Sequence, residues 1–162
     1  MQGITTDEFF ADAAKILTVL QSAFPQPIIL QADDICGAEE TDEYGMHSPR
    51  YLACFSAMLW LAEEGYLRFG ETVRTEAIDQ AVLSARCFVL LTKPTTFEPA
   101  AGESLTSEQF SENPEQNTSG VPVSVALDQS SLGHQLHAAL RPRDSLRLKT
   151  IMLRLMTAML KN

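Results

Sequence analysis

Apolar residues recur every three or four positions in the first part of the chain, which is the spacing of one face of a helix. Thr5 and Glu8 stand at the start of this pattern and form a capping box, while Pro25 follows its end. The pattern therefore predicts an amphipathic helix from Thr5 to Phe24. Its expected buried positions are Phe9, Ala13, Ile16, Leu17, Leu20 and Phe24.

The following residues predict a strand, a short helix and a longer helix. The run at 27–31 is short and apolar, which is typical of a strand, and residues 32–37 predict a helix of one or two turns. Acidic residues then crowd a loop, which we interpret as solvated because their spacing does not match a calcium-binding loop. The dipeptide Ser48-Pro49 is a strong start signal for a helix that we expect to span 49–65.

The predicted helix at 49–65 carries two different lines of side chains. We expect an inward stripe formed by Leu52, Phe55, Leu59 and Ala62, with Tyr51 and Met58 beside it. The line that we place opposite consists of Arg50, Ala53, Ala57, Trp60 and Glu64. Its small residues permit another element to approach closely, and Trp60 can anchor that element.

Strand patterns follow this helix. Residues 66–74 begin with alternating apolar and polar side chains, and residues 77–84 return as a second strand. We place the tip of this hairpin around Arg74 to Glu76. Ser84 is a suitable cap for a further helix at 85–93.

The composition changes near residue 93 and recovers near residue 130. The segment between them is rich in Ser, Thr, Glu, Pro and Gly, which is typical of a linker, and residues 121–126 are compatible with a short added strand. Helical spacing returns at 131–140 and again at 144–161, where Asp144 is the expected cap. We therefore expect three segments: a folded domain at 1–92, a linker at 93–129 and a helical dimerisation or docking segment at 130–162.

The last predicted helix is apolar around most of its circumference, so we expect it to be buried on several sides. One narrow polar line interrupts the apolar surface. This line consists of Arg147, Thr150, Arg154, Thr157 and Lys161.

The charge of the chain is uneven. The net charge is −9, which argues against passive binding to nucleic acid. Residues 141–162 contain six basic residues and one acid, a balance of +5, whereas residues 1–140 contain six basic and 20 acidic residues, a balance of −14. This opposition predicts that the basic tail docks on the body of its own chain or on that of a sister chain.

The predicted order of elements resembles that of the winged helix-turn-helix family. The segment MLWLAEEGYLRFGETV resembles the end of the third helix and the first wing strand of that family, and AVLSARCFVLL resembles the second wing strand with the helix after it. Cys87 stands where the family pattern has a glycine. The resemblance covers about residues 5–92 and implies an α+β fold that is mostly helical, with a small antiparallel hairpin as the wing.

The resemblance implies DNA binding, with the third helix in the major groove and the wing on the backbone. The residues favour another use, because base reading needs Arg, Lys, Asn or Gln on that helix, which offers Arg50 and little else. We therefore interpret the protein as a noncatalytic regulator or assembly factor that acts through protein contacts, with a DNA-binding transcriptional regulator as the alternative. The candidate contacts to a partner or to DNA are Arg50, Tyr51, Trp60, Arg68 and Arg74.

Sites for chemistry are weakly indicated. The chain carries no phosphate-binding loop and no hydrolase or metalloprotease motif, so we expect no enzyme activity, no cofactor and no metal. His134 and His137 have a spacing that suits metal ligands, but no further ligand is evident and we interpret them as solvated or capping residues. We expect Cys36, Cys54 and Cys87 to be small buried hydrophobes. The start of the chain does not resemble a secretion signal, and no long apolar run occurs, so we expect a cytoplasmic protein without membrane binding.

The last helix has three interpretations: it packs on the body of its own chain, pairs with its copy in a dimer, or lies on a membrane. We favour a homodimer, because many winged-helix proteins of this resemblance pair through helices outside the core. The candidate dimer contacts are Leu148, Met152, Leu155, Met156 and Met159.

Overall fold

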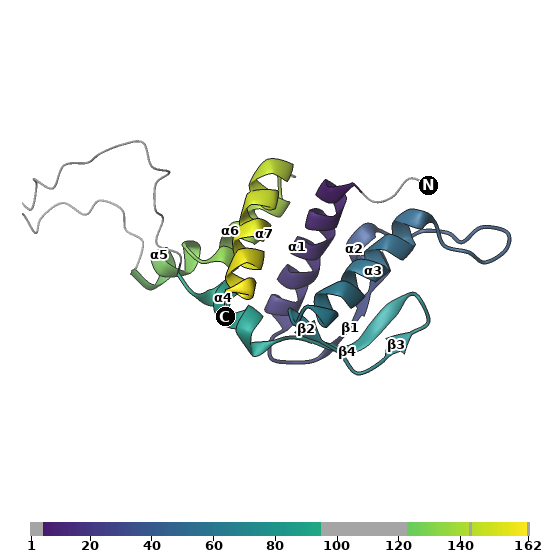
Figure 1. The fold of residues 1–162 in the computed structure, drawn as a ribbon, viewed down its shortest axis with the longest axis horizontal. Helices are drawn as coiled ribbons and strands as arrows, with labels where there is room; N and C mark the ends of the chain where they lie inside the picture. Colours follow the sequence, from purple (N-terminus) through teal and green to yellow (C-terminus); the bar gives the residue numbers. More distant parts are fainter. Residues whose placement is uncertain (1–4, 95–122, 143, 162) are drawn as a thin grey trace, which may run out of the picture.

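The computed structural model describes residues 5–94, 123–142 and 144–161, which form a mixed α+β arrangement of several helices and a small antiparallel sheet. In chain order the elements are α1 (Thr6–Ala23), β1 (Ile28–Gln31), α2 (Ala32–Cys36), α3 (Pro49–Glu63), β2 (Leu67–Arg68), β3 (Thr72–Val73), β4 (Ala77–Leu83), α4 (Ala85–Thr92), α5 (Val123–Gln129), α6 (Leu132–Leu140) and α7 (Ser145–Leu160). Figure 1 shows α1 in the middle, with α2, α3 and the sheet on one side and α6 and α7 on the other.

The predicted helix starts are confirmed by side chains that accept backbone N–H groups. Thr5 accepts from Glu8 and completes the capping box, Ser48 caps α3, Ser84 caps α4 and Asp144 caps α7. Each cap satisfies one of the N–H groups that a helix start leaves without an intrahelical partner.

Gly65 ends α3, as the sequence predicts. Its φ of 79° lies in the left-handed region, which glycine enters without a steric penalty. This turn lets the Tyr66 N–H donate to the Leu61 carbonyl at 2.9 Å and the Gly65 N–H donate to the Ala62 carbonyl at 3.1 Å. The chain thereby reverses direction and enters β2 directly.

β4 is the central strand of the sheet, as its pairing on both edges shows. β1 runs antiparallel along one edge, with Ile28 opposite Ala81, and β2 and β3 run antiparallel along the other, with Leu67 opposite Leu83. The predicted hairpin is thus confirmed, and Arg74, whose φ is 52°, lies in the turn at its tip.

The buried face of α3 is turned relative to the predicted stripe. Leu52 is exposed and Leu59 is only partly buried. The reason is that α3 packs against α2 on one side and against α1 on another, and Cys54 lies between these two helices. Arg50 and Trp60 both contact α1, so the line of small residues does face another element, as expected. The buried residues of α3 are Tyr51, Cys54, Phe55, Ala57, Met58 and Leu61.

α6 and α7 pack against the face of α1 that α3 leaves free, so the basic tail docks on its own chain. Gly133 in α6 lies so close to α1 that a Cβ atom there would overlap the Gln21 side chain. The Lys149 ammonium lies 3.8 Å from the Asp7 carboxylate, and the Arg86 guanidinium donates to the Lys161 carbonyl at 3.2 Å. One hydrophobic core therefore runs from the sheet through α1 to α7.

The five candidate dimer contacts face this core. Leu148, Met152, Leu155 and Met159 are buried, and Met156 is partly buried against the same cluster. They therefore do not form an exposed surface on the folded chain. An apolar pattern indicates that a face of a helix is covered, but it does not specify which chain covers it. The homodimer itself stays a prediction.

The prediction that α7 is buried on several sides is confirmed by its packing against α1, α4 and α6, but one side of the helix stays uncovered by the described residues. Leu146, Leu153 and Leu160 are exposed there, because α1, α4 and α6 together cover only part of its circumference. The polar line lies beside these leucines, and its five members are exposed as well.

The predicted linker falls largely outside the described residues, which omit 95–122. The strand expected at 121–126 is wrong where the structure describes it, since α5 begins at Val123. Pro94 and Ser131 form an isolated bridge, so the chain returns close to the point at which it left α4. Among the described residues, no helix combines the length and apolar character needed to cross a membrane.

Cys54 and Cys87 are fully buried, as predicted, whereas Cys36 is only partly buried. Burial raises the pKa of the Cys87 thiol from 9.0 to about 12. Burial also raises the pKa of Tyr66, so the fold favours the uncharged forms of the Cys87 thiol and the Tyr66 hydroxyl.

We expect the protein to lose stability at alkaline pH. Between pH 9 and about 12 the Cys87 thiol keeps its proton in the native state but loses it in the unfolded chain. The free energy of unfolding should therefore fall, by about 1.4 kcal/mol per pH unit for this group alone. Urea unfolding followed across this range measures the slope, which Cys87→Ala should reduce; an identical slope in that variant would contradict the assignment.

Candidate protein-contact surface

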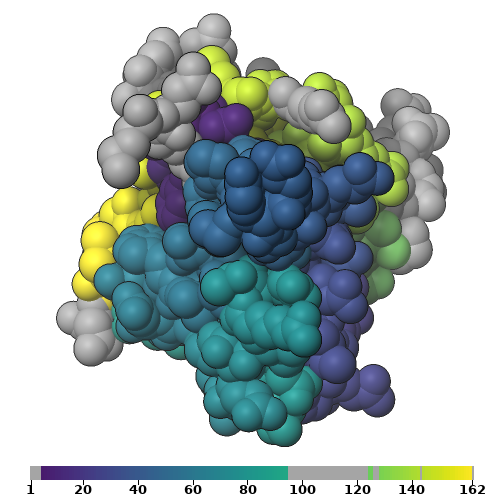
Figure 2. Space-filling view, turned by 90° about the vertical axis from the view of Figure 1, so that its right-hand side faces the viewer, coloured from purple at the N-terminus to yellow at the C-terminus, as the bar shows by residue number. Residues whose placement is uncertain are grey.

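The loop between α2 and α3, the outer side of α3 and the hairpin at 67–83 lie on one side of the molecule. Figure 2 faces this side and shows the loop above the hairpin, with α3 beside both. We call the exposed residues of these three parts the α3 surface. In the winged-helix family, which the sequence resembles, this surface would carry DNA, so its charges bear on the choice between the two predicted functions.

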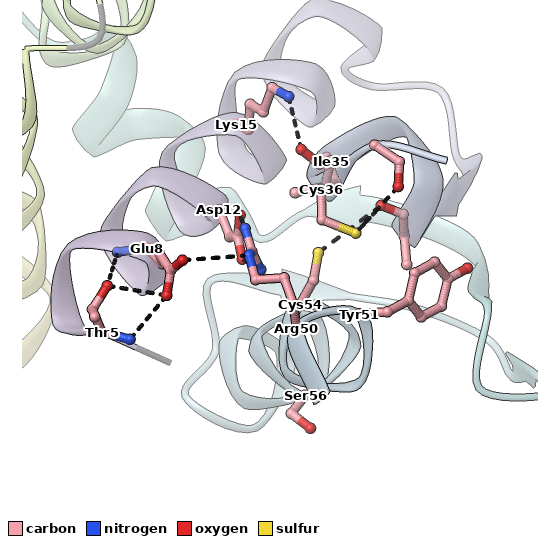
Figure 3. A network of polar contacts seen from close by, with 12 residues as sticks. Thr5, Glu8, Asp12, Lys15, Ile35, Cys36, Arg50, Tyr51, Cys54 and Ser56 are labelled. Atoms are coloured by element: carbon pink, nitrogen blue, oxygen red, sulfur yellow. Dashed lines mark hydrogen bonds and ion pairs between the residues drawn. The ribbon is translucent and has the colours of Figure 1, made fainter. Parts of the chain in front are cut away.

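Arg50 does not point out from the α3 surface. Its two terminal nitrogens donate to the two carboxylate oxygens of Asp12 in α1, at 2.7 Å each (Figure 3). Asp12 is only 2% exposed, so its charge depends on this bidentate partner. The hydrogen bonds to Asp12 raise the pKa of Arg50 further above its already high value. The one cation of α3 is therefore already paired within the chain, although its side chain stays 37% exposed.

Glu8 adds a second carboxylate to the same cluster. It accepts from the Thr5 N–H and the Thr5 hydroxyl at 3.0 Å each, and it lies 3.9 Å from the Arg50 guanidinium. Hydrogen bonds from the Thr5 backbone and side chain lower the pKa of Glu8. The helix cap of α1 and the anchoring of α3 thus share one polar network (Figure 3).

Tyr51 faces inward, which corrects its prediction as a contact residue. It is 3% exposed, and its ring stacks on His47 at 4.1 Å between centroids. Burial raises the pKa of Tyr51, and its interaction with Asp33 of α2 adds to that effect. Tyr51 therefore holds the start of α3 against α2.

Trp60 has a mixed position. Its ring packs edge-on against Phe9 of α1 at 5.3 Å between centroids and lies near Tyr66 at 6.0 Å. One edge stays exposed. Trp60 consequently anchors α1, as the sequence suggests, and keeps some surface for an outside contact.

The two arginines of the hairpin are the remaining predicted contacts. Arg68 in β2 and Arg74 at the tip are both exposed. Glu71, which is also exposed, lies between them in the sequence. The structure thus leaves two of the five predicted contact residues fully on the surface, with Trp60 partly available.

The α3 surface is acidic. Residues 38–83 contain nine acidic residues and three arginines, a balance of −6, and one of these arginines is paired with Asp12. The loop acids Glu39, Glu40, Asp42 and Glu43 are exposed. Such a surface repels a polyanion, since phosphate neutralisation supplies most of the nonspecific affinity for DNA.

Apolar side chains accompany these acids. Tyr44, Met46, Leu52 and Val73 are all exposed, and they come from the loop, from α3 and from the hairpin. The loop is internally braced, because an Asp42 carboxylate oxygen accepts from the Tyr44 and Met46 N–H groups at 3.0 and 2.8 Å. Exposed aromatic and apolar residues on an ordered frame are typical of protein interfaces.

A half-open cavity of about 410 Å³ lies beside the Arg50–Asp12 pair. The charged groups that line it already have partners within the chain: Asp7 has Lys149, Asp12 has Arg50, and the Lys15 ammonium donates to the Ile35 carbonyl at 2.7 Å. Within the described parts of the chain, no three His, Cys, Asp or Glu side chains gather in a way that could hold a metal ion.

Comparison with family models, with curated proteins and with solved structures returned no match to this chain.

The sequence interpretation missed Asp12, Tyr44 and Met46. A signal for Asp12 was present, because it falls three residues after Phe9 and four before Ile16 and so shares their buried face. A carboxylate in that position needs a buried partner. The identity of the partner depends on how α3 crosses α1, which the pattern alone does not specify.

Proposed function

We propose that residues 5–94 form a winged-helix domain that acts as a noncatalytic regulator or assembly factor by binding another protein through the α3 surface. The order of α1, β1, α2, α3, the hairpin and α4 supports the winged-helix assignment. The antiparallel pairing of β1 with β4 also fits such a domain.

The ion pair between Arg50 and Asp12 is the observation that favours a protein partner over DNA. A recognition helix reads bases with cationic or amide side chains, and α3 contains no Lys, Asn or Gln. The side chains that α3 does expose include Leu52, Ser56 and Glu63. These suit a partner with a basic surface and apolar pockets, which would also match the acidic loop.

A site-specific photo-cross-linker tests this proposal in the cell that makes the protein. We expect a cross-linker at position 52 or 44 to capture a defined protein partner, whereas one at position 89 should not, because Val89 is exposed on α4 outside the α3 surface. Leu52→Glu should abolish the capture from position 44. Capture at similar yield from all three positions would contradict the proposal.

DNA binding is measured in parallel by a gel-shift series with duplex DNA at low salt and at about 0.15 M salt. We expect no sequence-dependent complex at the higher salt. A tight complex with one sequence that survives this salt, and that Arg68→Glu and Arg74→Glu weaken, would favour the transcriptional regulator instead.

A further inference from the structure

α7 carries an exposed strip on the side that faces away from α1. Leu146, Leu153 and Leu160 are 76%, 46% and 80% exposed. Thr150 and Thr157 lie between them and are exposed as well. We call these five residues the α7 strip. Since the opposite face of α7 is buried in the core, the parts of the chain that the structure describes leave the strip uncovered.

The strip has the spacing of a helix-pairing seam. Its residues follow one another at alternating intervals of four and three, which is the 3.5-residue period of a coiled coil. Leucine occupies one of the two seam positions and β-branched threonine the other. A shallow groove of about 500 Å³ follows part of the strip and is lined by Thr150, Leu153, Thr157 and their neighbours. This geometry fits the side chains of a second helix.

A row of cations runs along one edge of the strip. Arg147, Arg154 and Lys161 each directly follow a leucine of the strip, and all three are exposed. None of them forms an ion pair with an acidic side chain in the part of the chain that the structure describes. The edge therefore presents three positive charges to whatever covers the leucines.

A second copy of α7 does not complement this edge. α7 contains no acidic residue, so pairing it with itself through the strip would bring cations together without counter-charges. A lipid surface is also a poor match, because the strip is narrow and membrane-binding helices present a broad apolar face. Nucleic acid would contact the cations through its phosphates but would leave the three leucines uncovered.

We propose that the α7 strip is a docking site for an acidic amphipathic helix of a protein partner. In this arrangement the partner's apolar seam covers the three leucines, and its flanking carboxylates pair with Arg147, Arg154 and Lys161. α7 lies on the other side of α1 from α3 (Figure 1), so the protein can bind this helix and a partner at the α3 surface at the same time.

The test uses the full chain and a labelled synthetic helix of about three heptads, with Leu and Val in the seam and Glu at both flanking positions. Fluorescence anisotropy should detect binding that weakens as salt rises. A peptide with the same seam and Lys in place of Glu should bind at least about tenfold more weakly. Leu153→Glu should reduce binding of the acidic peptide by about tenfold or more. Leu153→Thr is a milder variant that tests the same contact if the glutamate disturbs folding.

Charge reversal gives the sharpest result. The variant Arg147→Glu, Arg154→Glu, Lys161→Glu should lose the acidic peptide and gain the lysine peptide. The matched control is Gln26→Glu, Lys93→Glu, Gln129→Glu, Arg141→Glu, which changes the net charge equally at exposed positions outside α7 and the α3 surface and should bind like the original protein. Circular dichroism confirms that each variant is folded.

Three outcomes would overturn the proposal. The first is equal binding, or no binding, of the two peptides by the original protein. The second is a dimer in light scattering that Leu153→Glu dissociates, which would make a second copy the occupant of the strip. The third is stronger binding to vesicles with anionic lipids than to the acidic peptide, which would assign the strip to a membrane surface.

Discussion

A chain that ends at Leu140 is expected to lose its native fold. The truncation removes α7, which places Leu148, Ile151, Met152 and Leu155 in the core together with Met159. Burial of one such side chain contributes about 1.5–3 kcal/mol, so the loss amounts to roughly 8–15 kcal/mol. This equals the whole stability of a typical domain, which is about 5–15 kcal/mol.

Far-UV circular dichroism and urea unfolding of the truncated chain measure this loss. The full chain should unfold in one cooperative transition, and the truncated chain should show none. Met152→Ala provides a graded version, with a cost of about 2–5 kcal/mol because Met152 is fully buried. Leu146→Ala is the matched control on the same helix and should cost little, since Leu146 is exposed.

A truncated chain with a cooperative transition near that of the full chain would show that α7 is a peripheral addition. The core of the remaining chain would then be stable without the side chains that α7 contributes. The packing of α7 on both α1 and α6 argues for the opposite result, because its removal would uncover an apolar face on each of these helices.

The variant Arg50→Met is expected to destabilise the protein by about 3–5 kcal/mol. It leaves the Asp12 carboxylate buried without its bidentate partner, and the cost of an uncompensated buried charge exceeds the gain from an apolar replacement. Asp12→Asn should cost less, because the Arg50 side chain is 37% exposed and its charge stays partly hydrated.

The double variant Arg50→Met, Asp12→Leu separates the ion pair from other roles of Arg50. Replacing both partners with apolar residues should restore most of the lost stability. Urea unfolding of the original protein, Arg50→Met, Asp12→Leu and the double variant gives the coupling energy between the two residues. A single Arg50→Met variant as stable as the original protein would contradict the structural role and return Arg50 to the list of candidate outside contacts.

Much of the chain could be predicted because its signals are local. The starts of α1, α3, α4 and α7 each depend on a residue whose side chain reaches the next turn, namely Thr5, Ser48, Ser84 and Asp144. Gly65 ends α3 through its own backbone preference. The alternation and return of the hairpin likewise need only neighbouring residues to be recognised.

The candidate surfaces were harder to predict, because burial depends on what packs against an element. The stripe expected on α3 was misplaced. Two other helices, α1 and α2, pack against α3, and the sequence of α3 does not specify the angles at which they cross it. Arg50 and Tyr51 looked like outward residues for the same reason, and both turned out to be held by α1 and α2.

The sequence by itself determined the order and ends of most described elements, the mixed α+β class and the charge of each segment, since these follow from propensity, capping and composition. Only the tertiary structure decided that Arg50 pairs with Asp12, that α7 packs on its own α1 and that Leu146, Leu153 and Leu160 stay exposed. Each of these depends on a contact between residues far apart in the chain. A periodic pattern specifies that a face is apolar, whereas the crossing of helices specifies which part of that face meets protein and which part meets solvent.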